Sequence, residues 1–445
     1  MVMLLSFLKL IDEKIVLLVG CFIHLINSSN MIRTHQKVFL LSVLLLYALT
    51  ACNNSAGNSS NNNAQPDSNA LPPVETQKPN TNYKPAFPGQ TRAPGAKTET
   101  PLAITVIDST LENPWAICPL PDGRFLLTQN KGTMCIVSAD GRSKKQITGL
   151  PAVVSDGQGG LLDVNIDPDF SNNRVLYWTF SEKRAEGTLL SVAKGKLSTD
   201  ESKVEDALVI YRATPAFSGN LQYGSRILFD KAGNLLVSTG ERSAKEIRDQ
   251  AQDLNSSLGK IIHITPDGDA VPGGPFANKS KARPEVYAYG LRNPDGLAWN
   301  PETGELWEAE FGPRGGDEIN IIHAGRNYGW PVITYGIEYS GEKVGHGTQT
   351  LVGMEQPVYY WDPVISPGDI TFYDGDMIPE WKNNLFVAGL SSMHIARLII
   401  KDGKVIGEER LLQDKGERFR ALAMGKDGAL YAATDGGKMY RIAKK

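Results

Sequence analysis

The fold is decided by a stretch that begins at Pro121 and reads PDGRFLLTQNKGTMCIV up to Val137. A turn with Asp and Gly comes first, a run of strand-forming residues follows, and a second turn with Asn and Gly leads into another such run. This order is typical of a β-hairpin. An isolated hairpin leaves its apolar face uncovered, so the stretch requires further strands beside it.

The same pattern recurs along the chain. It returns as DPDFSNNRVLYWTF from Asp167, FDKAGNLLVSTGE from Phe229, NPETGELWEAEFG from Asn300, EWKNNLFVAGLSSMHIARL from Glu380 and GKDGALYAATDGGKMYRI from Gly425. Spacings of roughly 45–80 residues are typical of propellers and solenoids, whereas tandem β-sandwich domains need about 100 residues each. Closing the hairpins into a ring removes the open sheet edges. We therefore predict an all-β fold, a six-bladed β-propeller over residues 101–445, with a seventh, weak blade as the alternative.

The segment 31–51 reads as a lipoprotein signal peptide. Arg33 and Lys37 form a basic start, an apolar run follows, and small residues precede Cys52. The apolar run is too short to span a membrane comfortably, which favours a cleaved signal over an anchor helix. Small residues before a cysteine resemble the bacterial lipobox, so we expect lipidation at Cys52. The domain is then exported and lipid-anchored in the cell envelope, and Asn53 after the cysteine favours the outer membrane over a periplasm-facing inner-membrane anchor.

Two further segments flank this signal. Residues 1–30 contain three charges within an apolar stretch, so a start codon placed too early, with Met31 as the true start, is preferred over a second transmembrane helix. Residues 52–100 are rich in Asn, Ser and Pro and poor in apolar side chains. Such a composition cannot offset the entropy lost on ordering, so we expect a disordered tether.

The overall composition excludes some functions. Hydrophobic residues make up 41%, charged residues 21%, and the net charge is −3, which gives no basic surface for nucleic acid. The chain has four cysteines, too few for a disulfide framework. Cys118 and Cys135 could pair in an oxidising compartment or remain two separate buried thiols.

Four segments between the repeats carry side chains suited to ligand binding, because propellers bind ligands on the loops at the central channel. They read DGQGGLLD (156–163), YGLRNPDG (289–296), EFGPRGGDEIN (310–320) with NYGWP (327–331), and GERFR (416–420). In the first, Gln158 can both donate to and accept from a sugar hydroxyl. In the second, Arg292 and Asn293 present a planar cation and an amide. Each of these two segments has a purely structural alternative, a glycine-rich turn in one case and an arginine bonded to blade carbonyls in the other.

The third and fourth segments suit a cation and an anion respectively. Backbone carbonyls at Gly312 and Pro313 and the paired acids nearby are hard oxygen ligands of the kind calcium prefers, although the spacing is not that of an EF-hand. Arg418 and Arg420 are two apart on a predicted strand and therefore face the same side. Together they form a double cation suited to a ligand with several carboxylates.

In this order the four segments resemble those of the soluble PQQ-dependent glucose and aldose sugar dehydrogenases, over about residues 111–442. The resemblance implies a six-bladed propeller that binds PQQ and Ca²⁺ and oxidises an aldose, passing hydride from the anomeric carbon to the quinone and then electrons to an unidentified acceptor.

The resemblance also implies roles for individual residues. Arg292 and Asn293 match the pair that contacts the quinone oxygens, and Arg418 and Arg420 match cofactor-binding arginines. Gly312 and Pro313 match the turn that holds the cofactor-bound calcium, and Glu318 and the Tyr328 carbonyl match a separate calcium site. Gln158 matches a glutamine on the substrate side.

The chain departs from the family pattern at two positions. Counting back from Arg226, Gln222 stands where the family has its catalytic His, and an amide cannot act as a general base near neutral pH. Ser391 stands where the family usually has a Lys that contacts PQQ. The alternative function is therefore a catalytically impaired propeller that binds a sugar or an anionic ligand. A calcium-dependent lactonase-type propeller needs a central carboxylate–amide metal site that these motifs do not supply.

Overall fold

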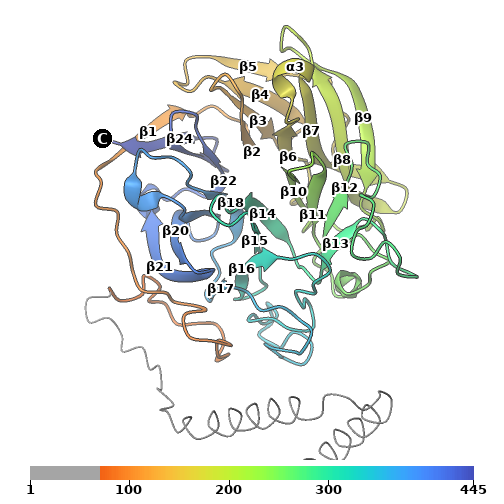
Figure 1. The fold of residues 1–445 in the computed structure, drawn as a ribbon, viewed down its shortest axis with the longest axis vertical. Coiled ribbons are helices and arrows are strands. Elements are labelled where there is room, and N and C mark those ends of the chain that lie inside the picture. The colour runs from red at the N-terminus through yellow and green to blue at the C-terminus, as the bar shows by residue number, and fades with distance from the viewer. Residues whose placement is uncertain (1–70) are drawn as a thin grey trace, which may run out of the picture. The chain divides into compact units, whose positions relative to one another are not determined.

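The computed structural model, which describes residues 71–445, places the stretch from Pro121 in the middle of a four-stranded antiparallel sheet (Figure 1). The Asp-Gly turn connects the first and second strands, and the Asn-Lys-Gly turn connects the second and third. All six copies of the pattern lie at this place in their own sheets. The predicted count of six blades is confirmed, and the seven-bladed alternative is wrong.

The first three blades follow one another along the chain. Blade 1 contains β2 (Pro114–Pro119), β3 (Phe125–Gln129), β4 (Thr133–Val137) and β5 (Lys144–Ile147). Blade 2 contains β6 (Leu161–Ile166), β7 (Val175–Arg184), β8 (Gly187–Leu197) and β9 (Val204–Arg212), with the short α3 (Phe170–Asn173) between its first two strands. Blade 3 contains β10 (Gly224–Phe229), β11 (Leu235–Thr239), β12 (Lys260–Ile264) and β13 (Val286–Tyr289), with the 3-10 turn η1 (Arg248–Ala251).

The last three blades complete the ring. Blade 4 contains β14 (Pro294–Trp299), β15 (Leu306–Glu310), β16 (Asp317–Ile322) and β17 (Tyr359–Trp361). Blade 5 contains β18 (Pro367–Phe372), β19 (Leu385–Gly389), β20 (His394–Lys401) and β21 (Lys404–Leu411), with the turns η2 (Pro379–Trp381) and η3 (Gln413–Lys415) on either side of its last three strands. Blade 6 contains β22 (Phe419–Met424), β23 (Leu430–Thr434), β24 (Met439–Lys444) and, as its outermost strand, β1 (Leu102–Asp108).

Strand β1 closes the ring, because the N-terminal strand pairs antiparallel with the C-terminal strand β24, from Leu102 opposite Lys444 onward. Hydrophobic clusters fill the space between neighbouring blades. Trp307 of blade 4, for example, is fully buried and packs edge to face on Phe372 of blade 5 at 5.6 Å between ring centroids. Cys118 and Cys135 are both buried and free, so the two-thiol alternative is the observed one.

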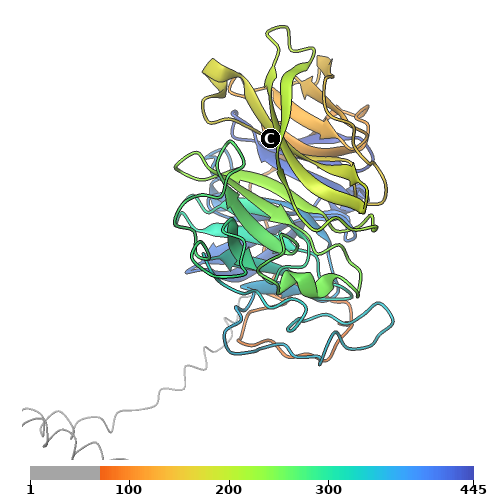
Figure 2. The same cartoon turned by 90° about the vertical axis from the view of Figure 1, so that its right-hand side faces the viewer.

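Residues 71–100 form an ordered strap along blades 4 and 5, and the expected disordered tether is wrong for this part of 52–100. Gly95 makes a parallel bridge with Glu408 of β21, and Arg92 donates to the carbonyls of Glu75, Gln77 and Asp362. Figure 2 shows the strap beside the long loop between β16 and β17. The strap buries few apolar side chains, and its order comes from hydrogen bonds to carboxylates and carbonyls of the blades, which its polar composition does not reveal.

The expectations for residues 1–70, including the early start, the signal peptide at 31–51 and lipidation at Cys52, lie outside the described residues. Within residues 71–445, no helix is long and apolar enough to cross a membrane.

We predict that Asp362→Ala loosens the strap and destabilises the propeller. The Asp362 carboxylate accepts four hydrogen bonds, from the backbone and side-chain nitrogens of Asn80 at 2.8 Å and from the backbone nitrogen and hydroxyl of Thr81 at 3.0 Å. A hydrogen bond to a charged group contributes about 1.5–3 kcal/mol net, and water that enters the loosened strap hydrates some of the freed donors. We therefore expect a loss of about 2–4 kcal/mol in the free energy of unfolding. Urea denaturation measures it.

The matched control is Asp376→Ala, since the Asp376 side chain is 91% exposed. We expect that change to stay within about 0.5 kcal/mol of the wild type. Equal stability of the two variants would show that the strap contributes nothing to the fold.

Candidate functional site

Each of the six innermost strands has a β-bulge near its start. The register shifts fall between Pro114 and Ala116, Leu161 and Val164, Gly224 and Ile227, Pro294 and Gly296, Pro367 and Asp369, and Phe419 and Ala421. A bulge leaves an extra residue out of the ladder and changes the direction of the side chains around it. The bulged segments contain Trp115, Asp163, Arg226, Asp295 and Arg420. The side chains of these residues lie at the central channel of the ring.

Arg226 connects the inner strands of four blades. Its guanidinium donates to the Asp163 carboxylate of blade 2 at 3.0 Å and lies 3.4 Å from the Asp369 carboxylate of blade 5. It also donates to two bulge carbonyls, that of Asp295 in blade 4 at 2.6 Å and that of Gly368 in blade 5 at 2.7 Å. Arg226 itself belongs to blade 3, so a single buried cation fixes the relative positions of these strands.

Three carboxyls share this region with Arg226, and burial raises the pKa of each. The pKa of Asp163 is raised, and those of Asp295 and Asp369 are raised to about 7. The charge of Arg226 opposes the effect in all three. Removal from water disfavours the charged carboxylate more than one guanidinium can compensate, so the channel favours a proton on Asp295 or Asp369 near neutral pH.

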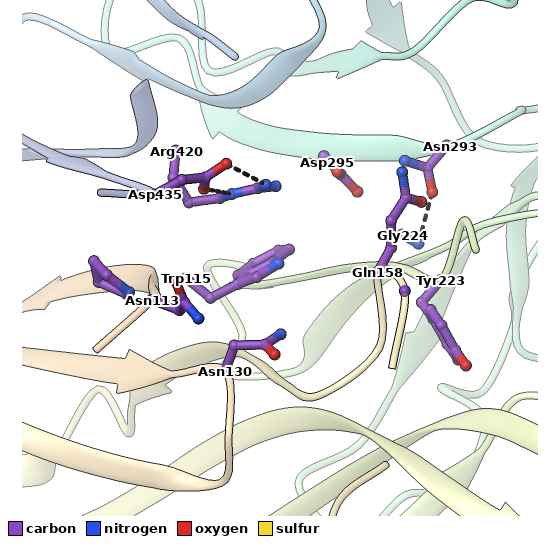
Figure 3. Close-up of a pocket in the computed structure, with 12 residues that line it drawn as sticks. Asn113, Trp115, Asn130, Gln158, Tyr223, Gly224, Asn293, Asp295, Arg420 and Asp435 are labelled. Carbon is purple, nitrogen blue, oxygen red and sulfur yellow. Dashed lines mark hydrogen bonds and ion pairs between the residues drawn. The ribbon is translucent and has the colours of Figure 1, made fainter. Parts of the chain in front are cut away.

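A central cavity of about 230 Å³ lies beside this network, lined by residues of five of the six blades (Figure 3). Its lining comprises Asn113, Pro114, Trp115, Asn130, Gly157, Gln158, Tyr223, Gly224, Asn293, Asp295, Arg420 and Asp435. In the figure, the Asp295 carboxyl lies between Arg420 on one side and Asn293 on the other. Amides, an indole and opposite charges around one cavity suit a polar ligand with both donors and acceptors.

The two predicted cofactor-binding arginines share one carboxylate. Arg418 and Arg420 each donate to Asp435 at 2.9 Å. Burial alone would raise the pKa of Asp435, and the two guanidiniums bring it below its ordinary value. Arg420 lines the central cavity, whereas the Arg418 side chain is 48% exposed beside it. Asp435 thus keeps its charge and neutralises part of the double cation.

Gln158, Gln222 and Asn293 meet around the start of β10. The Gln158 side-chain oxygen accepts the backbone N–H of Gln222 at 2.7 Å, and the Asn293 side-chain oxygen accepts the backbone N–H of Gly224 at 3.0 Å. Gln158 and Asn293 line the central cavity. Gln222 is buried in a left-handed conformation with φ of 49°, it is not among the lining residues, and its side-chain oxygen has no hydrogen-bond partner.

Arg292 faces a different cavity from its neighbour Asn293. This second cavity, of about 260 Å³, is lined by Glu241, Ser243, Lys245, Arg248, Arg292, Pro313, Trp330, Glu338, Tyr339 and Ser340. The Arg292 guanidinium donates to the carbonyls of Phe311 at 2.9 Å and Gly312 at 2.6 Å, and lies 5.1 Å from the Trp330 ring. Arg292 therefore holds the Gly312-Pro313 turn, which is the structural role that the sequence left open.

A third, small cavity of about 10 Å³ contains Gly312, Glu318 and Tyr328 in its lining, together with Glu310. That volume suits one water or one ion. Glu310 and Glu318 lie opposite each other on β15 and β16. Burial, followed by repulsion from Glu310, raises the pKa of Glu318, and burial raises that of Glu310 to about 7. Two facing buried carboxyls fit a hard divalent cation, although no three His, Cys, Asp or Glu side chains of residues 71–445 are grouped to hold a metal.

The remaining predicted positions lie away from these cavities. Ser391 bonds through its hydroxyl to Ser366 at 2.8 Å and lines neither the central nor the second cavity. The histidines of the described chain (263, 323, 346 and 394) line none of the three cavities either. No imidazole therefore replaces the missing family His in these cavities.

Several lining residues were missed by the sequence reasoning. They are Trp115, Asn130, Tyr223, Glu241, Asp295 and Asp435. Most lie just before an innermost strand, in its bulge, or just after the second strand of a blade. Asn130 and Asp435 follow β3 and β23 directly, and Glu241 follows β11 by two residues. These positions are equivalent from blade to blade. An alignment of the six copies of the repeat with one another would therefore have identified the missed residues.

The comparisons with known proteins agree with this geometry. Residues 111–441 match the family model described as glucose/sorbosone dehydrogenase. The chain is 38% identical to the aldose sugar dehydrogenase YliI of Escherichia coli over 77% of this chain and 93% of that protein.

Two solved structures extend the comparison. The soluble aldose sugar dehydrogenase of Escherichia coli in its apo form is 37% identical, covers 78% of this chain and 100% of its own, and superposes with a TM-score of 0.74. The PQQ-bound aldose sugar dehydrogenase of Streptomyces coelicolor is 26% identical, covers 78% of this chain and 99% of its own, and gives a TM-score of 0.64.

We predict that Asp295→Asn becomes more favourable to stability as pH rises. In the folded chain the pKa of Asp295 is raised from 3.8 to about 7, so the neutral acid stabilises the fold fully below pH 4 and this contribution is lost as pH rises through about 7. Asn does not titrate. The free energy of unfolding of the variant relative to wild type should therefore increase from pH 4 to pH 7, by about 1.4 kcal/mol for each pKa unit at most.

Asp435→Asn is the control of opposite sign, because the pKa of Asp435 is lowered. Its wild-type carboxylate contributes stability that is present above the unfolded pKa and is lost at lower pH. From pH 4 to pH 7 the difference between Asp435→Asn and wild type should therefore stay constant, and its opposite slope should appear only below about pH 4. Denaturation curves measure both variants, and parallel slopes from pH 4 to pH 7 would contradict the assignment of Asp295.

Proposed function

The chain belongs to the glucose/sorbosone dehydrogenase family, and on that premise we propose that it oxidises aldose sugars with PQQ as oxidant and calcium as the cofactor-bound metal. Membership of this family makes the chain an oxidoreductase of the sugar dehydrogenase type. The observation that carries the finer proposal is the central cavity, to which five blades contribute Gln158, Asn293, Arg420 and further polar groups.

PQQ carries three carboxylates, and when bound it would supply a quinone able to accept two electrons as hydride. Arg420 and Arg418 would hold its carboxylates, since both guanidiniums already bind the Asp435 carboxylate from one side. Asn293 would donate its amide to a quinone oxygen from the opposite wall of the cavity (Figure 3). The unpartnered Nε of Arg292 is a further buried donor without an acceptor in the protein.

Calcium fits two places by the chemistry of their oxygens. The Gly312-Pro313 turn would offer carbonyls to the cofactor-bound ion, with the Arg292 guanidinium moving off the Gly312 carbonyl that it now contacts. Glu318 and the Tyr328 carbonyl would hold a second ion in the small cavity, where a cation would relieve the repulsion between Glu310 and Glu318.

A second candidate function is a propeller that binds its ligand and turns over slowly or not at all. Gln222 and Ser391 favour it. The Gln222 amide cannot remove a hydroxyl proton, and general-base catalysis is worth about 10²–10⁴-fold in rate. Ser391 removes one cation from the family's cofactor contacts. The retained arginines nevertheless support cofactor binding in either case.

The test is a titration of the purified protein with PQQ, followed by absorbance and by reduction of a dye with an aldose. We expect saturable binding with calcium present and loss of binding with EDTA. We expect the double change Arg418→Ala, Arg420→Ala to weaken PQQ binding by about 100-fold or more. Each lost charged hydrogen bond contributes about 1.5–3 kcal/mol, and Asp435, left without its two guanidinium partners, would repel an anionic ligand.

The control is Arg441→Ala, since Arg441 pairs with Asp427 and lines neither the central nor the second cavity. Its PQQ affinity should match the wild type. Binding without dye reduction would favour the second candidate function. Absence of PQQ binding would remove the PQQ-dependent oxidation and leave a propeller that binds a sugar or another anionic ligand.

We further propose that the chain is exported and anchored by lipid at Cys52, as the segment from Met31 to Cys52 indicates. We expect Cys52→Ala to move the protein from the membrane fraction to the soluble extract of cells. Membrane association that is unchanged by this substitution would count against the anchor.

A further inference from the structure

The long loop between β16 and β17 exposes a group of apolar side chains. Val332, Tyr339, Leu351 and Val352 are 36%, 70%, 48% and 101% exposed. No other loop or strand of residues 71–445 has more than two large apolar side chains that are exposed to this degree. Single apolar side chains on a surface are ordinary, whereas a group of them on one segment indicates a contact surface.

Two of these side chains lie at the tips of turns. Val352 belongs to the turn Leu351–Met354 and Tyr339 to the turn Glu338–Gly341. In each turn the backbone N–H of the last residue donates to the carbonyl of the first, at 3.1 Å and 2.8 Å respectively. Turn tips usually carry Gly, Pro, Asn, Asp or Ser. An apolar side chain at such a tip gains free energy when it leaves water.

The apolar tips are neighbours, and the chain around them has few charges. Val332, Glu338 and Leu351 line one hollow of about 590 Å³. The 11 residues from Val344 to Met354 include no Asp, Glu, Lys or Arg. Removing a charge from water is costly, so this stretch can enter an apolar medium without that cost.

The strap holds the loop in place. The Tyr335 ring of the loop stacks on Tyr360 of β17 at 4.0 Å between ring centroids. The Tyr335 hydroxyl donates to the Gln90 side chain of the strap at 3.1 Å, and the Gln90 amide donates to the Pro357 carbonyl at 2.9 Å. The apolar tips are therefore presented by an ordered loop, which Figure 2 shows beside the strap at one edge of the propeller.

The strap also connects the propeller to the proposed lipid anchor. Its first residue, Leu71, forms a bridge with Gly95, which in turn forms a bridge with Glu408 of β21. The 19 residues from Asn53 to Leu71 span at most about 65 Å at full extension. A compact domain as long as residues 71–445 has a radius of gyration of about 21 Å. Acylation at Cys52 would therefore keep blades 4 and 5, along which the strap runs, close to the lipid.

The size and shape of the apolar surface favour lipid over a protein partner. A stable protein interface buries about 800 Å² on each partner, and four side chains on two projecting turns offer less than that. Apolar side chains that project from a surface can instead enter the boundary between headgroups and acyl chains. Tyr339 suits this boundary, because its ring is apolar and its hydroxyl is polar.

We propose that the loop between β16 and β17 inserts Tyr339, Leu351 and Val352 into the lipid surface that holds the anchor. This inference rests on the proposed acylation at Cys52. The acyl chains keep the protein at the membrane, and the loop determines which edge of the ring faces the lipid.

The test places a fluorophore on the loop. The full acylated chain with Val352→Cys is labelled with an environment-sensitive dye and reconstituted into vesicles of phosphatidylethanolamine and phosphatidylglycerol. Cys118 and Cys135 are buried, so the dye reacts at the new thiol. We expect blue-shifted emission, quenching by a nitroxide-labelled lipid and protection from iodide in the water.

The matched control is Leu208→Cys with the same dye, which also accounts for the apolar character of the dye itself. Leu208 is 56% exposed on β9 of blade 2, which lies across the ring from blade 5 (Figure 1). We expect its dye to remain open to iodide and to escape quenching by the nitroxide lipid.

A substitution beside the dye measures the contribution of the loop. In the Val352→Cys protein, we expect Leu351→Ser to lower the partition of the loop into lipid by about tenfold or more, as the burial of a Leu side chain implies. Leu208→Ser, which changes a leucine of similar exposure on blade 2, should leave the quenching unchanged.

The outcomes separate the loop from the anchor. A Val352 dye that iodide reaches in vesicle-bound protein would overturn the lipid contact and leave the anchor in place. Protection from iodide without quenching by the nitroxide lipid would overturn it in favour of a contact between copies of the chain. If the protein does not stay with the vesicles, the anchor fails. Vesicles added in excess then decide the loop, because quenching supports its lipid contact and absence of quenching overturns it.

Discussion

The guanidinium of Arg226 is the interaction on which the rest of the structure depends. It is 5% exposed and contacts two carboxylates and two bulge carbonyls from three neighbouring blades. Removing one partner from a buried charged network leaves the others desolvated and unpaired, which destabilises proteins by about 3–5 kcal/mol. The inner strands can therefore approach one another only in the arrangement that brings their bulges to this cation.

The cavities follow from the same constraint. A bulge frees backbone carbonyls and changes the direction of the side chains beside it, and here it occurs in every blade at the channel. Some of the freed groups satisfy Arg226, and others line the central cavity. Carboxyls gathered in this dry region hold protons at pH values where exposed ones would not, so the packing that closes the ring also produces groups suited to acid–base chemistry.

The fold could be predicted from the sequence because its information is local. Each copy carries its own turn residues and strand-forming runs, and the ring follows from the need to cover six similar hairpins. The strap could not be predicted from composition, since Asn80, Thr81 and Arg92 are ordered by partners nearly 300 residues away in the chain, such as Asp362. Closure of blade 6 by β1 is equally non-local, because Leu102 pairs with Lys444.

The candidate site was predictable as a set of segments but not as an arrangement. Arg292 and Asn293 are adjacent in sequence and both precede β14, yet they line different cavities. Glu241 has no motif of its own, and only the folded chain places it with Arg292 in the lining of the second cavity. Where a family's base is missing, the sequence shows the loss at Gln222. The surroundings of that position depend on contacts with distant residues, such as the Gln158 side chain that accepts its backbone N–H, and only the folded chain identifies those.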